Sequence, residues 1–302
     1  MATEVAPLPA RPAAATATAS EPVGDRTARW RRILAYVLLI AYALLMFIPF
    51  AWTIITSFKT NPDAVRLTFI PQPFSLEGWN VAFNGLDPGL LQLFFNSALI
   101  AGVVTLTNVF LGSMAGYAFA RLRFPGRELL FLLVLATLMI PDQLRLVPVY
   151  QVLVFLNLIN DSPTNYIGVV IVLAISATSI FLIRQYFLTI PRDLEEAAKI
   201  DGAGFFTTFW RVMLPLASPA LAAVAILQFQ GTWNGFFWPL IVLQNSSHWT
   251  VPLGLFQFIG FHLTDWPPLM AVVVMATLPI FILYVFFQRY FVEGIAASGV
   301  KG

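Results

Sequence analysis

The most polar stretch within the apolar part of the chain runs from Glu196 to Pro219 and separates two long apolar segments. Glu196, Lys199 and Asp201 lie within six positions of one another, beside small and aromatic residues. Side chains of these types form ion pairs and protein contacts. The stretch therefore predicts a recognition element with a task of its own in an otherwise apolar chain.

Sequence motifs for bond-making chemistry are missing from the chain. The sequence holds no G-x-x-x-x-G-K-[ST] loop, and its three lysines, Lys59, Lys199 and Lys301, are not placed to hold a nucleotide phosphate. The sequence has no G-x-S-x-G elbow, and the absence of cysteine excludes disulfides, thiol nucleophiles and cysteine-ligated zinc. His248 and His262 are separated by a spacing that matches no metal motif. We therefore expect no catalytic residue and no metal site.

The stretch around Glu196 has the signals of two short helices that meet at a glycine. Pro191 suits a first helical turn, and three acidic residues favour the positive end of the helix dipole: Asp193, Glu195 and Glu196. Gly202 can adopt the left-handed conformation that ends such a helix. A second helix is predicted from about Phe205 to Val212, closed by Pro215.

The composition of this element suggests a docking surface. Ala197 and Ala198 allow close approach of another backbone or side chain. An apolar, aromatic surface of the kind that anchors protein contacts is predicted from Phe205, Phe206, Phe209 and Trp210. The alternative is an ordinary amphipathic connector lying at a membrane surface.

The composition of the whole chain predicts an all-α membrane protein. Hydrophobic residues make up 59% and charged residues 11%, against roughly 25% charged residues in soluble domains. Six transmembrane helices are predicted at about Ile33–Ser57, Leu93–Ala120, Leu129–Ile140 with a continuation towards Leu156, Tyr166–Leu188, Leu216–Leu243 and Pro267–Phe287. Except for the third, each of these apolar segments approaches or exceeds the roughly 20 residues that cross a bilayer core.

The third segment is interrupted by Pro141 and Pro148, with Asp142 and Arg145 between them. A broken helix is tolerated in a membrane only where protein or a water-filled cavity satisfies the freed backbone groups. We therefore expect this region to face neighbouring helices or a translocation path.

Basic residues predict the orientation of the spans. With a cytoplasmic N-terminus, almost all of the arginines and lysines fall inside, and only Lys59, Arg66 and Arg145 remain outside. This places both termini and the Glu196–Pro215 element in the cytoplasm. Residues 1–29, rich in Ala, Pro and Thr, are predicted to form a disordered cytoplasmic tail, and residues 30–302 the transmembrane domain. The basic residues show no patch suited to nucleic acid.

The polar stretch resembles the EAA signature of the membrane subunits of bacterial ABC importers. The matching positions are Glu196, Ala197, Ala198, Asp201, Gly202, Ala203, Phe209, Val212, Leu214, Pro215 and Pro219. Further segments resemble the MalG-like carbohydrate-uptake branch of that family, over roughly Arg32–Gly302. These are Phe187–Pro191, Thr232–Asn234, Trp238–Leu240, Gln288–Val292 and Gly299–Gly302.

This resemblance implies a transport subunit without enzymatic activity of its own. Such a permease pairs with a second, usually different permease subunit, two cytoplasmic ATPases that hold ATP and Mg²⁺, and an extracytoplasmic solute-binding protein. The EAA helix then inserts into a cleft of one ATPase, with Glu196 as the candidate partner of a basic residue there. The resemblance also suggests that the tail at Gly299, Val300 and Lys301 reaches the ATPase; a frayed terminus is the alternative.

Polar residues within the spans are candidates for a substrate path, since such residues are costly in lipid. The candidates are Asn96, Asn108, Gln143, Arg145, Gln151, Gln228, Gln230 and Asn234, with Trp233 as a possible stacking surface for a sugar. Asn and Gln also join helices, and Trp233–Gly235 is equally suited to a kink. An ion-coupled secondary transporter is the second hypothesis, and a membrane enzyme or scaffold the third. The sequence does not define the sugar or sugar-like substrate.

Overall fold

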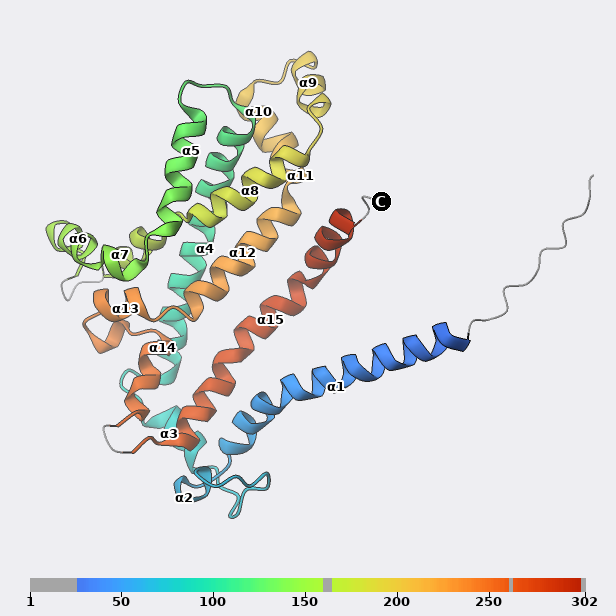
Figure 1. The fold of residues 1–302 in the computed structure, drawn as a ribbon. Helices are drawn as coiled ribbons and strands as arrows, with labels where there is room; N and C mark the ends of the chain where they lie inside the picture. Colours follow the sequence, from blue (N-terminus) through green and yellow to red (C-terminus); the bar gives the residue numbers. More distant parts are fainter. Residues whose placement is uncertain (1–25, 160–164, 261–262, 300–302) are drawn as a thin grey trace, which may run out of the picture. The chain divides into compact units, whose positions relative to one another are not determined.

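The computed structural model describes residues 26–159, 165–260 and 263–299, with side chains from residue 29 to residue 287 within these ranges (Figure 1). The chain divides into two units, Met1–Ala51 and Trp52–Gly302. The predicted tail falls mostly outside the described residues, and the first helix already begins at Arg26.

Helices account for almost all of the described secondary structure, and the β contact present there is a bridge between Ile259 and Thr264. The α-helices are α1 (Arg26–Thr56), α2 (Asn61–Ala64), α3 (Glu77–Asn84), α4 (Leu90–Arg121), α5 (Arg127–Ala136), α6 (Asp142–Phe155), α7 (Asn165–Leu173), α8 (Ala177–Thr189), α9 (Asp193–Ile200), α10 (Phe205–Thr208), α11 (Leu214–Leu216), α12 (Ser218–Trp233), α13 (Phe237–Val242), α14 (Val251–Gly254) and α15 (Trp266–Gly299). Short 3₁₀ or π turns are η1 (Thr137–Met139), η2 (Phe209–Met213), η3 (Ser246–His248) and η4 (Leu255–Phe258).

Three segments are long and apolar enough to cross a membrane as single helices: Arg29–Thr56, Leu90–Arg121 and Trp266–Phe287. Three further helix pairs reach that length and composition only together, because each is bent at a short break. The segment made of α5 and η1 bends by 105° relative to α6. The other two bends measure 44° between α7 and α8 and 74° between the α10–α11 segment and α12. The all-α class is therefore confirmed for the described residues.

The predicted break in the third segment occurs at one of the two prolines. Pro141 caps α6 in an extended conformation, which suits a residue that cannot donate a backbone hydrogen bond. Pro148, in contrast, lies inside α6 without ending it. The expectation of a second break at Pro148 is therefore wrong.

The break between α7 and α8 lies in the fourth predicted segment. It was not predicted, because no proline or glycine marks it. The buried side chain of Asn108, on α4, donates a hydrogen bond of 2.7 Å to the carbonyl oxygen of Leu173, where α7 ends. Asn108 also accepts a hydrogen bond of 3.2 Å from Ser179 on α8. The polar residue in an apolar helix thus satisfies the backbone that the break frees.

The fifth predicted segment begins and ends differently in the structure. The helix continues through Pro215 to Leu216 and bends at Ala217, so the expectation that Pro215 closes the second short helix is wrong. The π turn at Phe209–Met213 lies directly before Pro215, where a regular helix would lack one donor. At the other end α12 stops at Trp233 rather than at Leu243.

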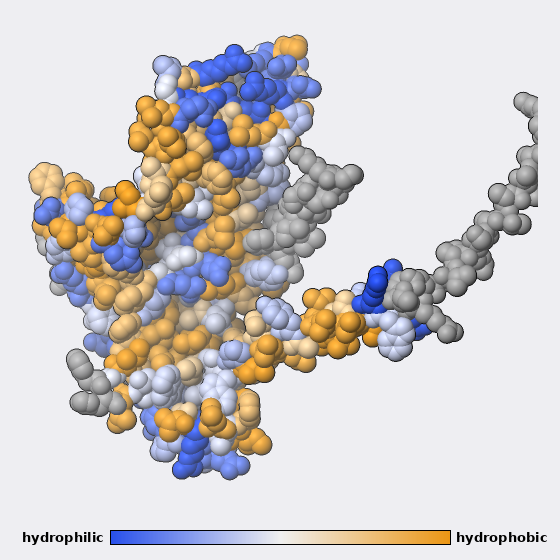
Figure 2. Space-filling view, in the orientation of Figure 1, coloured by the Kyte–Doolittle hydropathy of each residue, from blue (hydrophilic) through white to orange (hydrophobic). Residues whose placement is uncertain are grey.

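The core of the second unit forms where α4 packs against α8 and α12, and where α15 packs against α12 and α3. In Figure 1, α4, α12 and α15 run between the two ends of this unit. Figure 2 shows hydrophilic residues gathered at the end that carries α9 and the α4–α5 loop, and again around α2, with a mostly apolar surface between. This distribution fits a protein surrounded by lipid along its middle.

Candidate functional site

Helix α9 ends in the left-handed turn that was predicted from Gly202. Gly202 has a φ of 83°, in the left-handed region. The Ala203 N–H donates to the Ala198 carbonyl at 2.9 Å, and the Gly202 N–H to the Lys199 carbonyl at 3.0 Å. These two bonds define a Schellman turn, which satisfies carbonyl groups at the helix end and aims α9 back towards α10.

A buried ion pair ties α9 to the end of α4. Arg121 Nε lies 3.2 Å from Glu195 Oε1, and the two side chains are only 4% and 12% exposed. This contact lies outside hydrogen-bond geometry, so the attraction is that of an ion pair. The same guanidinium also donates to the Ile190 carbonyl, where α8 ends. Arg121 therefore joins α4, α8 and α9 at one point.

Aromatic packing fixes the second half of the element. The Tyr117 ring on α4 lies with its centroid 5.4 Å from Phe187, 5.6 Å from Phe205 and 5.1 Å from Phe209. Phe209 is buried, so the expectation that it forms part of an outer docking surface is wrong. The π turn carries Phe209 inward against α4 and α8.

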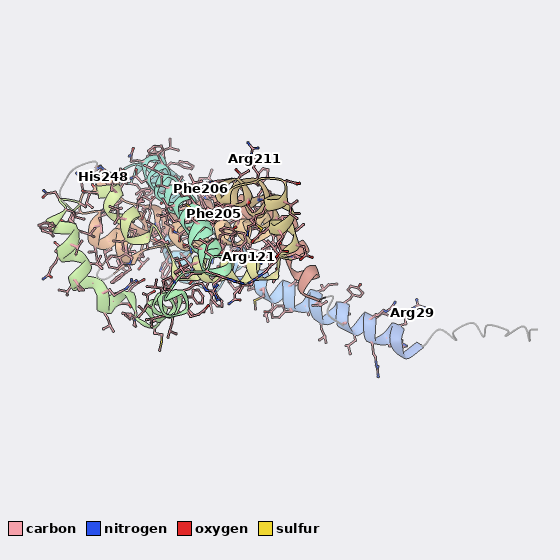
Figure 3. All side chains as sticks on the ribbon, turned by 90° about the horizontal axis from the view of Figure 1, so that it is seen from above. Arg29, Arg121, Phe205, Phe206, Arg211 and His248 are labelled. Atoms are coloured by element: carbon pink, nitrogen blue, oxygen red, sulfur yellow. The ribbon has the colours of Figure 1, made fainter. Side chains whose placement is uncertain are left out.

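Several apolar side chains remain exposed at this polar end of the molecule, among them Leu194, Phe205 and Trp210, and the two most exposed on α9 and α10 are Ile200 and Phe206. Ile200, in the last turn of α9, is 86% exposed, and Phe206, in α10, is 68% exposed. Figure 3 shows Phe205 and Phe206 next to one another, with Arg211 projecting elsewhere. We name Ile200 and Phe206 the apolar tip. Exposed apolar groups rimmed by charged residues are typical of protein contact sites.

The predicted coupling residues surround this tip. Glu196, Ala197, Asp201, Gly202 and Pro215 are exposed, while Ala198, Ala203 and Leu214 are half-buried. Within the described residues Glu196 has no ion-pair partner, in contrast to its neighbour Glu195. The structure therefore gives the two adjacent carboxylates different positions, one inside the fold and one on its surface.

A polar cavity of ≈ 420 Å³ lies beside the break at Pro141. Asp142 and Arg145, which form an ion pair one turn apart on α6, line this cavity together with Gln228 on α12 and Trp238 on α13. Arg145 Nε and the Trp238 indole nitrogen are buried donors without a hydrogen-bond acceptor among the described residues. These groups offer hydrogen bonds to a polar molecule in the cavity.

Most other candidates for the substrate path lie elsewhere. Gln143, Gln151, Gln230 and Asn234 are exposed and do not line this cavity. Asn96 is buried and donates to the carbonyl groups of Ser247 and Trp249 at 3.0 and 2.8 Å, so it holds the segment after α13 against α4. Its role in the structure is to join segments.

Trp233 is buried rather than presented to a solute. Its ring stacks on Phe229 at a centroid distance of 5.7 Å and contacts Phe94 edge-on, and its indole nitrogen donates to the Ala276 carbonyl at 3.0 Å. The expectation that Trp233 stacks on a sugar is therefore wrong for this conformation, and the kink that was the alternative is present where α12 ends.

The predicted histidine and tail positions lie partly outside the described residues. Groups of three or more His, Asp or Glu suited to a metal do not occur within the described residues. His248 packs edge-on against Tyr166, whereas His262 lies outside the described residues. Helix α15 ends at Gly299, and Val300 and Lys301 lie outside the described residues.

Sequence reasoning missed the two features that define the site best. The pairing of Arg121 with Glu195 joins residues far apart in the chain, so the sequence shows Arg121 only as a positive charge beside an apolar segment. Ile200 is one aliphatic residue in a polar helix, so it is a weaker signal than the neighbouring aromatic residues. Its position directly before the Asp201–Gly202 turn was the signal for an exposed tip.

Comparisons with known proteins identify the family of the chain. The family model described as "Binding-protein-dependent transport system inner membrane component" matches residues 108–296, more than half of the chain. The chain is 38% identical over 276 residues to an arabinooligosaccharides transport system permease protein AraQ from Halalkalibacterium halodurans, covering 89% of this chain and 98% of that protein. It is 32% identical over 274 residues to an sn-glycerol-3-phosphate transport system permease protein UgpE from Yersinia enterocolitica, covering 88% and 96%.

A solved structure shows the same fold. It is the crystal structure of a bacterial ABC transporter involved in the import of the acidic polysaccharide alginate, with a TM-score of 0.75 at 24% sequence identity. The match covers 90% of this chain and all of that chain. The family that the Glu196–Pro219 stretch indicated is thus confirmed, and the chain belongs to the binding-protein-dependent transport system inner membrane components.

Proposed function

We propose that the chain is the membrane permease subunit of an ATP-driven importer for a sugar or sugar-like solute. The family gives the transport role, and relatives named for arabinooligosaccharides and sn-glycerol-3-phosphate support the solute class. In this proposal the chain pairs with a second permease subunit in the bacterial cytoplasmic membrane. It receives its solute from an extracytoplasmic binding protein and binds two ATPases, which hold ATP and Mg²⁺.

The observation that carries this proposal is the α9–α10 element, with its exposed apolar tip and its buried attachment. Ile200 and Phe206 are available to enter a groove of an ATPase, and Glu196 is free to pair with a basic residue there. Arg121 and Glu195 hold the same element against α4. A movement imposed on the tip is thereby passed to the spans.

Six membrane crossings follow if each bent helix pair counts as one span. An even number puts both termini on one side, and the arginines that flank the spans put that side in the cytoplasm. Helix α9 then lies between the fourth and fifth spans on the cytoplasmic side, and α10 begins the fifth span. The tail at Gly299, Val300 and Lys301 ends on that side too, where we propose contact with an ATPase.

The cavity beside Arg145 is the proposed solute path within this subunit. Arg145, Gln228 and Trp238 offer donors to the hydroxyl or phosphate oxygens of such a solute. Gln143, Gln230 and Asn234, which lie outside the cavity, are expected to contribute less. An ion-coupled secondary transporter remains the alternative function, and it requires no ATPase at the tip.

The first prediction tests the coupling role of the apolar tip. Ile200→Asp and Phe206→Ala should each weaken ATPase binding, because truncating an anchor at an interface costs about 2 kcal/mol, or roughly 30-fold in affinity. Co-purification of the ATPases and solute uptake are the measurements. Leu67→Asp, at a residue that is 91% exposed at the other end of the unit, is the matched control.

Normal ATPase recovery and normal uptake in both tip variants would contradict the coupling role. Uptake by the unmodified transporter should also survive an ionophore that collapses ion gradients, and stop when ATP is depleted. The opposite pattern would favour the ion-coupled alternative.

The second prediction concerns the attachment of α9. Arg121→Gln leaves Glu195 in the fold without its cation, and breaking a largely buried pair costs on the order of 3–5 kcal/mol. We expect uptake to fall at least tenfold and amide exchange across residues 193–203 to accelerate, while ATPase binding persists. Arg211→Gln, at an exposed arginine, should change neither. Unchanged exchange and uptake in Arg121→Gln would show that the pair does not hold the element.

The third prediction concerns the cavity. Trp238→Phe keeps most of the ring but removes the indole donor, and one hydrogen bond is worth about 1 kcal/mol, so the KM for uptake should rise roughly fivefold. Gln143→Ala, outside the cavity, serves as the comparison and should raise the KM less than Trp238→Phe does. Equal KM values for both variants and the wild type would remove the cavity from the path.

The fourth prediction concerns orientation, and uses the natural absence of cysteine. Ser247 and Thr207 are both exposed and lie in segments predicted on opposite sides of the membrane. Ser247→Cys should react with an impermeant thiol reagent added to sealed cells, and Thr207→Cys should react only after the cells are opened. External labelling of Thr207→Cys would reverse the orientation and remove the coupling element from the cytoplasm.

A further inference from the structure

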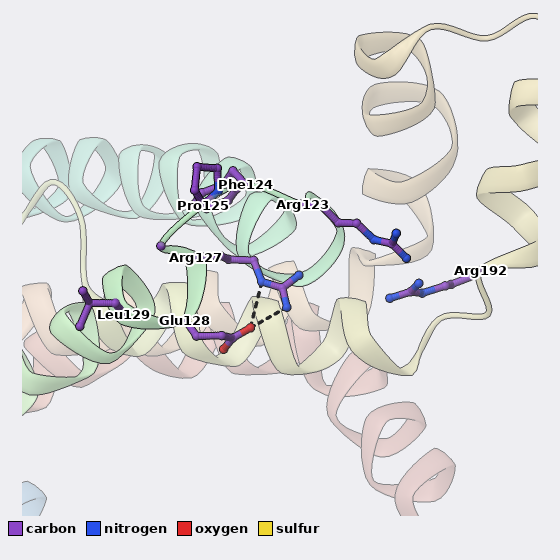
Figure 4. Close-up of a pocket in the computed structure, with 8 residues that line it drawn as sticks. Arg123, Phe124, Pro125, Arg127, Glu128, Leu129 and Arg192 are labelled. Carbon is purple, nitrogen blue, oxygen red and sulfur yellow. Dashed lines mark hydrogen bonds and ion pairs between the residues drawn. The ribbon is translucent and has the colours of Figure 1, made fainter.

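Two arginines next to the coupling element face one another without an acidic partner. Arg123, in the loop after α4, and Arg192, just before α9, line an open groove of ≈ 730 Å³. Figure 4 shows their guanidinium groups directed towards each other. Neither has an ion-pair partner within the described residues. Two like charges in this position call for an anion between them.

Two acidic side chains near the groove are already engaged with other arginines. Glu128 accepts from Arg127 at 2.5 and 2.9 Å and lies 3.7 Å from Arg184. Glu195 is paired with Arg121.

Two further acids lie nearby, Asp193 and Glu196, and both are exposed. Glu196 lines an adjoining groove of ≈ 410 Å³ together with Arg123, Arg192 and Lys199, and neither acid forms an ion pair with these residues in the described structure. The positive charge of the two arginines is thus left without compensation by the chain itself.

Besides Arg127 and Glu128, which pair with each other, apolar residues line the groove and continue onto the side of α5. Phe124, Pro125 and Leu129 line it next to Arg123. Further along α5, Leu132 and Leu133 are 61% and 55% exposed. A ligand that fits has an anionic head and hydrocarbon chains. An acidic side chain of a partner protein would pair with the arginines. It would not cover the exposed leucines of α5.

We propose that the groove binds the phosphate of an anionic phospholipid between Arg123 and Arg192, with its acyl chains along the exposed leucines of α5. Guanidinium groups bind phosphate oxygens in pairs. Basic pockets between helices at the cytoplasmic side of a membrane protein are suited to lipid head groups. This site goes beyond the transport role, and it places a lipid head group beside the first turn of α9.

The test uses the full chain, purified in a neutral detergent, and does not require a working transporter. Dihexanoyl phosphatidylglycerol is titrated in, and bound lipid is counted by native mass spectrometry. Dihexanoyl phosphatidylcholine and inorganic phosphate are titrated in parallel. We expect saturable binding of the phosphatidylglycerol alone, weakened at least tenfold in the double variant Arg123→Gln, Arg192→Gln. Arg211→Gln, which removes one exposed arginine outside the groove, should bind as the wild type does.

Several results overturn the proposal. Undiminished phosphatidylglycerol binding in the double variant removes the arginines from the site, and equal binding of the choline lipid removes the charge requirement. Inorganic phosphate that binds as tightly indicates a free-anion site instead. Loss of ATPase recovery with unchanged lipid binding assigns the arginines to a protein contact. If the double variant is not monodisperse, the single variants Arg123→Gln and Arg192→Gln are measured, each with an expected loss of at least threefold.

Discussion

Helix ends in this protein leave carbonyl groups without a partner in their own helix, and the chain meets this constraint with side chains from neighbouring segments. Asn108 donates to the Leu173 carbonyl at the end of α7, and Arg121 to the Ile190 carbonyl at the end of α8. The Leu122 carbonyl after α4 accepts from Arg127, and the Leu243 carbonyl after α13 from Trp249. Each bond stabilises a break and fixes the next segment.

The same constraint explains why the coupling element is rigid where it meets the spans. Arg121 caps α8 through its bond to Ile190 and pairs with Glu195 in the first turn of α9. A single buried cation thus meets the requirements of two helices. Arg184 is held in a similar way, since it donates to the Phe119 carbonyl and stacks over the Phe131 ring at 4.0 Å. At this end of the molecule, cations that define topology also hold the helices together.

The parts of the fold that depend on local chemistry were predictable from the sequence. The long apolar helices, the break at Pro141 and the turn at Gly202 follow from hydropathy, a missing N–H and a positive φ. The break after α7 was not predictable in this way, because it depends on a partner distant in sequence. The continuation through Pro215 was not predictable either, because it depends on a π turn whose Phe209 packs against Tyr117 on α4. Asn108 supplies the bond that permits the first, and the π turn before Pro215 permits the second.

The candidate site shows the same division. The sequence motif predicted α9 and its turn, but it did not distinguish Glu195, whose side chain is only 12% exposed, from Glu196, which lies on the surface. Nor did it show that Trp233 turns inward while Trp238 lines the cavity. Such differences depend on how a helix is rotated against its neighbours, and that rotation follows from packing in three dimensions rather than from the order of residues.

Close packing then determines which helices move together under the proposed coupling. A Cβ at Gly116 would lie 3.0 Å from the backbone nitrogen of Arg184, so α4 and α8 meet almost backbone to backbone. Arg121 adds α9 to this pair. A force on the apolar tip therefore displaces α4, α8 and α9 as one body. The solute cavity is lined by Asp142 and Arg145 on α6 and by Gln228 on α12, whose amide donates to Ser179 on α8 at 2.9 Å. Displacement of α8 relative to α6 changes the walls of the cavity without any bending of the coupling helix.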